Sequence, residues 1–471
     1  MYMTMEISLL LAVSMAAFAQ AALGEEPKIP DNMRSMIEKT QSFGLGKYPI
    51  SFWSYTNLTE HGQYMDEAEV EEWADAGFTV PQSPRPDPND PEQKKHMIRL
   101  LNWAHDRGMK LIVCDPRCYA RRGPGGEEGT IPADYADGVR AAVEDFGRHL
   151  ATFGFHIGDE PDANMKEAFF ECYRVQKSVA PHLHPFANLL PFFHGAEKRA
   201  GTDTWPNYLD EYVKKGNADL ISYDYYAQMN PGQSGWNGYY ENLRLYREAA
   251  LRNGVPFWNT LLSVGHFRYR CPNLDEIRWQ FNTTIASGAH GVLWFFYYMR
   301  QPHANYRLSP VDEHWNRTQT YDDIHLVQKS FHRHYGDLFT RLASTRVSFY
   351  PEAFGGGQVF SPNGIISRIL PDKEGHPILI GEFVDIVGHR YAMIVNNSMT
   401  ESVNLSITFP GEDARVFSWN WSGKEYQGGA YCASYQSRDE NGFTIRHWLA
   451  PGQEAVYRVE SESAANEPIG E

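Results

Sequence analysis

Eight short apolar runs alternate with amphipathic helical patterns between about Tyr48 and Leu342. Near-continuous apolar runs of this length are typical of parallel strands that are covered on both faces. A closed (β/α)8 barrel accommodates eight such repeats, whereas a doubly wound open sheet more often has a Gly-rich first turn, which this sequence lacks. The expected strands are 48–55, 77–82, 109–115, 153–160, 184–190, 218–226, 256–263 and 290–298.

Helix start and stop signals separate these runs. Asp66 precedes Glu69 by three residues, and Gly77 follows the same helical pattern. Asp90-Pro91 opens a second helix that ends near Gly108. A third expected helix begins at Asn273, with Glu276 three residues later, and leads to Gly288. These signals support the strand–helix alternation.

The pattern changes after Leu342. Helical periodicity stops, glycines at 355–357 and Pro362-Asn363-Gly364 interrupt the chain, and period-two alternation appears at 390–395, 403–409, 415–419 and 443–449. Short alternating strands separated by turn signals favour an antiparallel β-sandwich. We therefore expect a catalytic barrel over 25–345, a β-sandwich domain over 346–462 and a disordered tail over 463–471.

The first residues resemble a targeting segment. The apolar run 7–19 is too short to span a bilayer stably, and small residues follow it. We interpret 1–24 as a signal peptide of bacterial type and expect a secreted or periplasmic protein without a membrane span. The net charge of −16 disfavours a nucleic-acid partner. The sequence leaves the oligomeric state open.

The five cysteines lack a zinc-binding spacing, so buried or free thiols are the expected state and no metal or cofactor is assigned. Aromatic residues make up 14% of the chain, which fits either a large core or aromatic platforms that pack on sugar rings. Position in the fold has to decide between these two interpretations.

In a (β/α)8 barrel the active site lies at the carboxyl ends of the strands. The residues expected there are acids, amides and aromatics, without a Ser-His-Asp set or a phosphate loop. This combination fits carbohydrate chemistry. The residues that we expect to bind substrate are Trp53, Tyr55, Arg85, Asp115, Asn188, Tyr225, Trp258, Trp294 and Tyr297.

The sharpest motif is FHIGDEP at 155–161, at the end of the fourth expected strand. Gly158 permits a close backbone approach, and Pro161 ends the strand. Two adjacent carboxyl groups, Asp159 and Glu160, are costly unless each has a partner or one stays protonated. A carboxyl group that is protonated near neutral pH can act as the general acid in glycosidic bond cleavage. The alternative is that both residues cap the helix that follows Asp162.

The Asp159-Glu160-Pro161 element resembles the Asn-Glu-Pro element of the large (β/α)8 clan of retaining glycosidases. The resemblance implies that Glu160 is the acid/base and that Asp159 takes the place of the clan's Asn. This chain departs from the clan at strand seven, where 261–266 reads LLSVGH without the nucleophilic Glu. A retaining pair needs its second carboxyl group about 5 Å away.

The adjacent Asp-Glu pair is also similar to that of β-N-acetylhexosaminidase and β-N-acetylgalactosaminidase families. This resemblance implies that Asp159 orients the substrate's own acetamido group as nucleophile, with Tyr225 as a candidate to bind the acetamide carbonyl. Substrate assistance would explain why the seventh strand lacks the nucleophilic Glu. Asp224, in a Tyr-Asp run like that of chitinase-like barrels, is a third candidate: a base, a group that tunes Glu160, or a buried structural residue.

Together these features predict a secreted glycoside hydrolase that cleaves β-linked sugars of poly- or oligosaccharides. Its catalytic residues would be Glu160, Asp159 and Asp224. The alternative is a catalytically inactive, carbohydrate-binding barrel protein, which the missing seventh-strand carboxylate permits.

Overall fold

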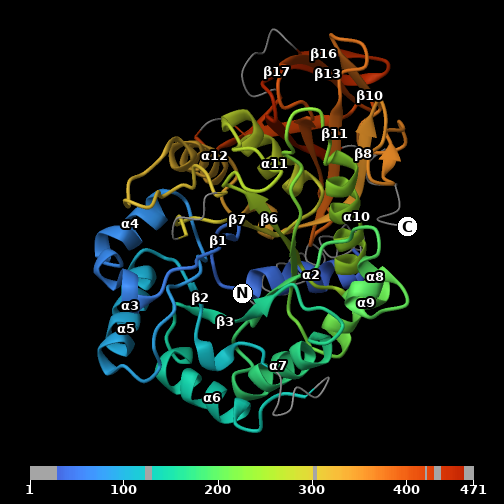
Figure 1. Cartoon of the computed structure of the whole chain (residues 1–471). Helices are drawn as coiled ribbons and strands as arrows, with labels where there is room; N and C mark the ends of the chain where they lie inside the picture. The colour runs from blue at the N-terminus through green and yellow to red at the C-terminus, as the bar shows by residue number, and fades with distance from the viewer. Residues whose placement is uncertain (1–28, 122–129, 301–304, 420–421, 429–435, 461–471) are drawn as a thin grey trace, which may run out of the picture.

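The computed structural model describes residues 29–121, 130–300, 305–419, 422–428 and 436–460 (Figure 1). Within these residues, seven parallel strands form one sheet in the order β1-β7-β6-β5-β4-β3-β2. The predicted signal peptide and tail, and Cys432, lie outside the described residues. The strands are β1 (Ile50–Phe52), β2 (Leu111–Val113), β3 (Thr152–Asp159), β4 (Phe186–Leu189), β5 (Ile221–Asp224), β6 (Phe257–Leu262) and β7 (Gly291–Phe295).

The second expected strand, 77–82, joins the two edges of this sheet without being a regular strand. The Thr79 N–H donates to the Ile50 carbonyl of β1 at 2.9 Å, and the Ile112 N–H of β2 donates to the Pro81 carbonyl at 3.0 Å. The Ser83 N–H in turn donates to the Ile112 carbonyl at 3.0 Å. Pro81 has no N–H, which interrupts the ladder at this point. Seven of the eight expected runs therefore contain regular strands, and the remaining one, 77–82, bridges β1 and β2 through hydrogen bonds.

Helices surround the sheet (Figure 1). The expected caps are confirmed: the Asp66 side chain accepts from the Glu69 N–H, and Asn273 and Glu276 form a capping box. The helices are α2 (Asp31–Ser42), α3 (Leu58–His61), α4 (Glu67–Asp75), α5 (Pro91–Asp106), α6 (Tyr135–Ala142), α7 (Lys166–Val179), α8 (Ala196–Ala200), α9 (Trp205–Lys214), α10 (Trp236–Asn253), α11 (Leu274–Ala286) and α12 (Gln319–Tyr335).

The C-terminal strands form two further sheets, in the orders β10-β13-β17-β16 and β15-β14-β18-β12-β11-β8-β9. All their pairs are antiparallel except β8 with β9. Both sheets contribute to one buried cluster that includes Ile380, Ile394, Leu405 and Ile445. The strands are β8 (Leu342–Tyr350), β9 (Gln358–Val359), β10 (Arg368–Pro371), β11 (Ile378–Asp385), β12 (Arg390–Asn396), β13 (Val403–Phe409), β14 (Arg415–Trp419), β15 (Glu425–Gln427), β16 (Gln436–Asp439), β17 (Gly442–Leu449) and β18 (Glu454–Glu460).

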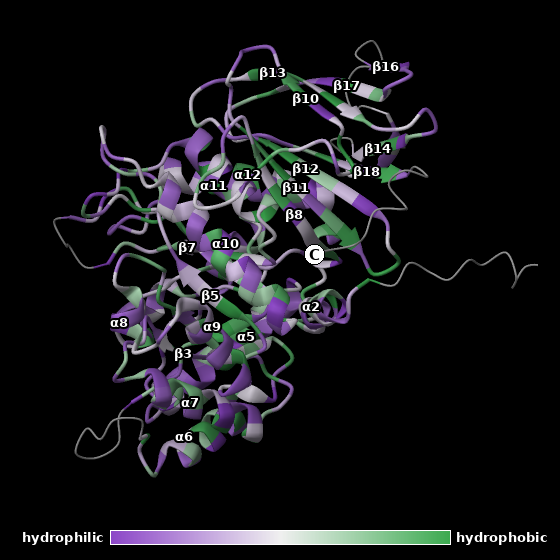
Figure 2. Ribbon diagram, turned by 90° about the vertical axis from the view of Figure 1, so that its right-hand side faces the viewer, coloured by the Kyte–Doolittle hydropathy of each residue, from purple (hydrophilic) through white to green (hydrophobic). Residues whose placement is uncertain are grey.

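The C-terminal strands pack closely on the helices of the first sheet. Figure 2 shows hydrophobic residues along β8, β11 and β12. A Cβ atom on Gly381 of β11 would lie 2.1 Å from the Ala286 carbonyl oxygen of α11, so only glycine permits this approach. Within the described ranges, no helix is long and apolar enough to cross a bilayer, and no cluster of three potential metal ligands occurs. Cys114, Cys118 and Cys172 are free, buried thiols, as expected.

Candidate active site

A cavity of about 530 Å³ opens at the carboxyl ends of β1, β2 and β3. This is the end of the sheet at which the sequence predicts a site. The FHIGDEP motif lines part of this cavity. The residues that follow β1 and those that end the irregular segment 77–82 line another part. Its polar and aromatic lining comprises Trp53, Ser54, Tyr55, Thr56, Gln82, Arg85, Tyr119, His156, Asp159, Glu160, Asp162 and Arg199.

The backbone turns sharply where β3 enters this cavity. Gly158 has a φ of +157°, and a Cβ atom there would lie 2.7 Å from Cζ of Phe169. Glu160 has a φ of +41°, an unusual conformation for a residue with a side chain. Its N–H donates to the Asn188 carbonyl at 2.9 Å, which holds the turn in place. Such conformations persist only when the surrounding structure imposes them, and they concentrate at functional sites.

The Glu160 carboxyl group lies in the cavity and pairs with Arg199 of α8 at 3.2 Å. One third of its side chain is exposed (33%), so a ligand can reach it. Burial, together with the charges of Asp224 and Asp159, raises its pKa to about 7 against the opposing effect of Arg199. A substantial share of Glu160 is therefore protonated near neutral pH.

Glu160 does not cap the helix after it. The helix α7 begins at Lys166 without a side-chain cap. In the turn before it, Oδ1 of Asp162 accepts from the N–H groups of Asn164 at 3.0 Å and Met165 at 3.2 Å. The alternative interpretation, in which Asp159 and Glu160 cap the helix that follows Asp162, does not fit this geometry.

Asn188, at the end of β4, joins two carboxyl groups behind Glu160. Its Nδ2 donates to Oδ1 of Asp159 at 3.0 Å and to Oδ1 of Asp224 at 2.7 Å. Asp159 lines the cavity and is exposed. Desolvation, followed by the charge of Asp224, raises its pKa to about 7. Burial also raises the pKa of Asp224, while Asn188 and the neighbouring Tyr226 favour its charged form. Three acids thus share one small volume.

Aromatic rings cover the floor of the cavity. His156 is buried between Trp53, at 5.1 Å between ring centroids, and Tyr119, at 5.6 Å. Burial lowers the pKa of His156 to about 3, so the ring is neutral at ordinary pH. The expected residues Trp53, Tyr55 and Arg85 line the cavity.

The expected binding residues did not include several others that line the cavity, among them His156, Gln82, Tyr119 and Arg199. His156 belongs to the FHIGDEP motif, so its place near the strand end was the signal that could have indicated it. Gln82 had a signal as well, because it stands at the carboxyl end of the second expected strand. Tyr119 and Arg199 have no comparable signal, because they reach the cavity from a loop and from a short helix.

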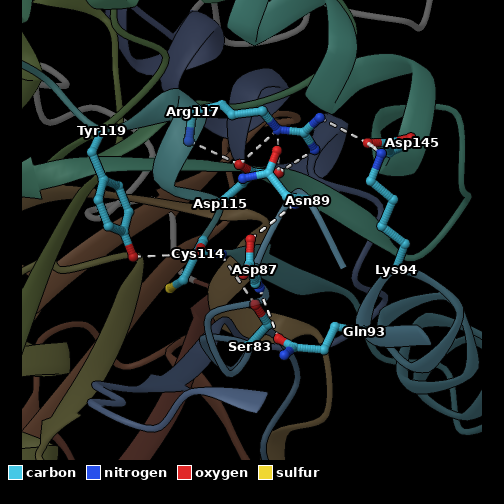
Figure 3. Close-up of polar contacts among 10 residues, drawn as sticks. All are labelled: Ser83, Asp87, Asn89, Gln93, Lys94, Cys114, Asp115, Arg117, Tyr119 and Asp145. Atoms are coloured by element: carbon cyan, nitrogen blue, oxygen red, sulfur yellow. Dashed lines mark hydrogen bonds and ion pairs between the residues drawn. The ribbon is translucent and has the colours of Figure 1, made fainter. Parts of the chain in front are cut away.

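Asp115 and Tyr225 lie away from the cavity. Asp115 is fully buried and makes a bidentate pair with Arg117, at 2.6 Å for the shortest contact, and Arg117 also pairs with Asp145 at 2.8 Å (Figure 3). The Tyr225 hydroxyl lies against Gly238 of α10. Neither side chain is among the residues that line the cavity.

The prediction that Trp258, Trp294 and Tyr297 contact substrate is corrected by their positions, since all three are fully buried. Trp258 packs against Phe153 inside the sheet, at 5.6 Å between ring centroids. Strand alternation turns Trp294 to the outside, where its Nε1 donates to Gln328 of α12 at 3.1 Å. Tyr297 stacks on the ring of Phe52 at 4.4 Å. These aromatics belong to the core.

Solved structures show which fold this is. The chain resembles a glycoside hydrolase family 5 structure from Bacteroides vulgatus, with a TM-score of 0.56, 10% identity and coverage of 88% of this chain and 89% of that one. A second glycoside hydrolase structure gives a TM-score of 0.54 at 11% identity, over 88% of this chain and 93% of that one.

The chain therefore has the α/β fold of these glycoside hydrolases: a curled sheet of parallel strands with surrounding helices, followed by further β-sheets. No protein-family model and no curated protein matches the sequence.

Proposed function

We propose that this protein is a glycoside hydrolase and that Glu160 is its general acid. The observation that carries the proposal is a carboxyl group with a pKa near 7, held in a left-handed backbone conformation at the end of β3 and reachable from a cavity. A general acid works best when its pKa lies near the working pH.

The chemistry follows from this placement. Glu160 would donate its proton to the oxygen of the leaving group as the bond from that oxygen to the sugar's anomeric carbon breaks. The resulting carboxylate would be stabilised by Arg199 at 3.2 Å. It could then take a proton from the attacking water, which restores the acid.

Asp159 is the second carboxyl group that opens onto the cavity. Residues 261–266 supply no acid from β6 and the loop after it, so a protein nucleophile at the clan's usual position is missing. We propose that Asp159 orients an acetamido group of the substrate. Asn188 would hold Asp159 in place, because its Nδ2 donates to Asp159 at 3.0 Å and is itself anchored on Asp224 at 2.7 Å. An inverting enzyme is the second candidate. Asp224, the base expected for it, is not among the residues that line the cavity, so Asp159 would take that role. The β-linkage is part of the proposal.

The organisation of the chain is proposed along the same lines. We propose that 25–345 forms a closed barrel, supported by the hydrogen bonds of Thr79 and Pro81 to both edge strands. We propose that 346–462 forms a β-sandwich, supported by the cluster that its two sheets share. The segment 1–24 is proposed to direct secretion.

The test compares wild type with Glu160→Gln on a panel of β-linked nitrophenyl glycosides that includes N-acetylhexosaminides and galactosides, and on polysaccharides. The variant keeps the shape of the side chain but cannot donate the proton. We expect a loss of about a hundredfold or more. Glu38→Gln, an equal change on the exposed face of α2, is the matched control and should keep full activity. Equal rates in wild type and Glu160→Gln would remove Glu160 as the acid.

The panel also separates the two candidates and the binding-only alternative. Cleavage restricted to N-acetylhexosaminides supports substrate assistance, whereas cleavage of sugars without an acetamido group requires a base or nucleophile from the protein. Binding of saccharides without cleavage of any of them would instead identify a carbohydrate-binding barrel.

A further inference from the structure

Arg85 lines the same cavity as the acids, and its backbone is held in place. It stands between Pro84 and Pro86, which restrict the backbone. Its N–H donates to the Thr56 carbonyl at 3.0 Å, and its carbonyl accepts from the Leu58 N–H at 2.9 Å. The side chain is exposed and lines the cavity. A fixed backbone with a reachable guanidinium presents a preorganised cation to a ligand.

No carboxylate forms an ion pair with Arg85 in the part of the chain that the structure describes. Arg199, the other arginine that lines the cavity, is paired with Glu160. The charge of Arg85 acts on Cys114 and Tyr119, where it opposes the rise in pKa that burial causes in both. This places the guanidinium beside Cys114 and Tyr119. Asp115, whose charge also acts on both, is fully buried and already paired with Arg117.

Other hydrogen-bond donors line or adjoin this cavity. Gln82 is fixed by its Oε1, which accepts from the Ser54 N–H at 3.0 Å. Its buried Nε2 has no acceptor among the described residues. A second guanidinium, Arg300, stacks over the ring of Tyr55 at 4.0 Å from the ring centroid, and Tyr55 lines the same cavity. Among the described residues, the cavity therefore offers an unpaired guanidinium and a free amide donor in a chain whose net charge is −16.

The cavity thus holds the acids Asp159 and Glu160 together with the cation Arg85. A negative group on a ligand would be repelled by the acids and attracted by Arg85, which fixes its direction. A guanidinium binds planar oxyanions through two parallel hydrogen bonds. A neutral sugar would leave this charge without a counterpart.

We propose that the cavity takes a sugar bearing an anionic substituent, either the carboxylate of a uronic acid or a sulfate ester, and that Arg85 binds this substituent. The proposal rests on the proposed function only in that the bound sugar is also the substrate. Binding itself is independent of cleavage.

The experiment measures Kd by calorimetry or ligand-observed NMR on the full chain carrying Glu160→Gln, which prevents turnover. The probes are methyl β-glucuronide, methyl β-galacturonide, the 6-sulfates of methyl β-glucoside and methyl β-galactoside, and the two neutral glycosides. We expect at least one acidic probe to bind about tenfold more tightly than its neutral counterpart, with an advantage that weakens as salt increases. Uronates and sulfates in separate arms identify the anion.

Arg85→Gln should abolish this preference while it leaves the binding of the neutral glycosides within about twofold. Arg99→Gln, which removes the same charge from an exposed position on α5, is the matched control and should retain the preference. Equal binding of acidic and neutral probes, no binding of any acidic probe, or an unchanged preference in Arg85→Gln would overturn the proposal. Hydrolysis of neutral glycosides alone would leave the glycosidase intact but reject the anion site. Arg85-dependent binding without hydrolysis of any probe would support the anion site but reject the glycosidase.

Discussion

The side-chain nitrogen of Asn188 donates a hydrogen bond of 2.7 Å to Oδ1 of Asp224. The same nitrogen lies 3.0 Å from Oδ1 of Asp159, so carboxyl groups from β3 and β5 share one amide of β4. Burial raises the pKa of both acids and that of Glu160 beside them. Neighbouring acids of this kind titrate as a group, and the group retains a proton to higher pH than an isolated carboxyl would.

Activity should fall as pH rises through about 7, because Glu160 must be protonated and its pKa is raised to about 7. Arg199 favours the charged form of Glu160. Arg199→Gln should therefore move the alkaline limb of the kcat/KM profile upward by about half a pH unit, as expected for a partly exposed pair. Lys198→Gln, on the same short helix, is the control and should leave the limb in place. A limb that moves downward would contradict the assignment.

Asp224 should make folding sensitive to pH. Its pKa is raised in the folded chain, so the folded state binds this proton more tightly than the unfolded state does. The stability that this proton provides is present at low pH and is lost as pH rises from the ordinary value of 3.8 through the raised one. Asp224→Asn removes the cost of the buried charge.

We therefore expect the Tm advantage of Asp224→Asn over wild type to grow by about 2 °C between pH 4.5 and pH 8, measured by calorimetry. Asp75→Asn, at an exposed position on α4, should show no such growth. An advantage of the same size at both pH values would mean that the carboxyl group is not perturbed.

Arg117 compensates the fully buried charge of Asp115 through contacts of 2.6 to 3.2 Å. Arg117→Met would leave that charge unpaired and should lower the free energy of unfolding by about 3–5 kcal/mol in urea titrations. Arg140→Met breaks an exposed pair with Asp137 and should cost at most about 1 kcal/mol. A similar small loss in both variants would indicate that water reaches Asp115.

Gly158 permits the backbone turn that places Glu160. In Gly158→Ala, the new Cβ would lie 2.7 Å from Phe169 in a conformation that side chains rarely adopt. We expect a loss of about 1–3 kcal/mol of stability and a large loss of activity, because the turn has to shift. Gly62→Ala is the control, since its Cβ would meet His96 at an ordinary 3.7 Å. Full activity in Gly158→Ala would show that the turn tolerates a side chain.

The sequence by itself determined the strand–helix alternation, the caps at Asp66 and Asn273, and the position of FHIGDEP at a strand end. These features depend on local periodicity and local hydrogen bonding, which neighbouring residues encode. Pro81 was the local signal that the second expected strand would be irregular, because it cannot donate to a ladder.

Only the tertiary structure decided what surrounds Glu160. Arg199 is 39 residues away in sequence, and Asn188 reaches Asp224 across 36 residues. Contacts of this kind depend on strand register and helix placement, which composition and periodicity do not specify. The same applies to the aromatics: whether a tryptophan faces a cavity or the core is set by the side of the strand on which it lies. Trp53 therefore lines the site, while Trp294 packs beneath α12.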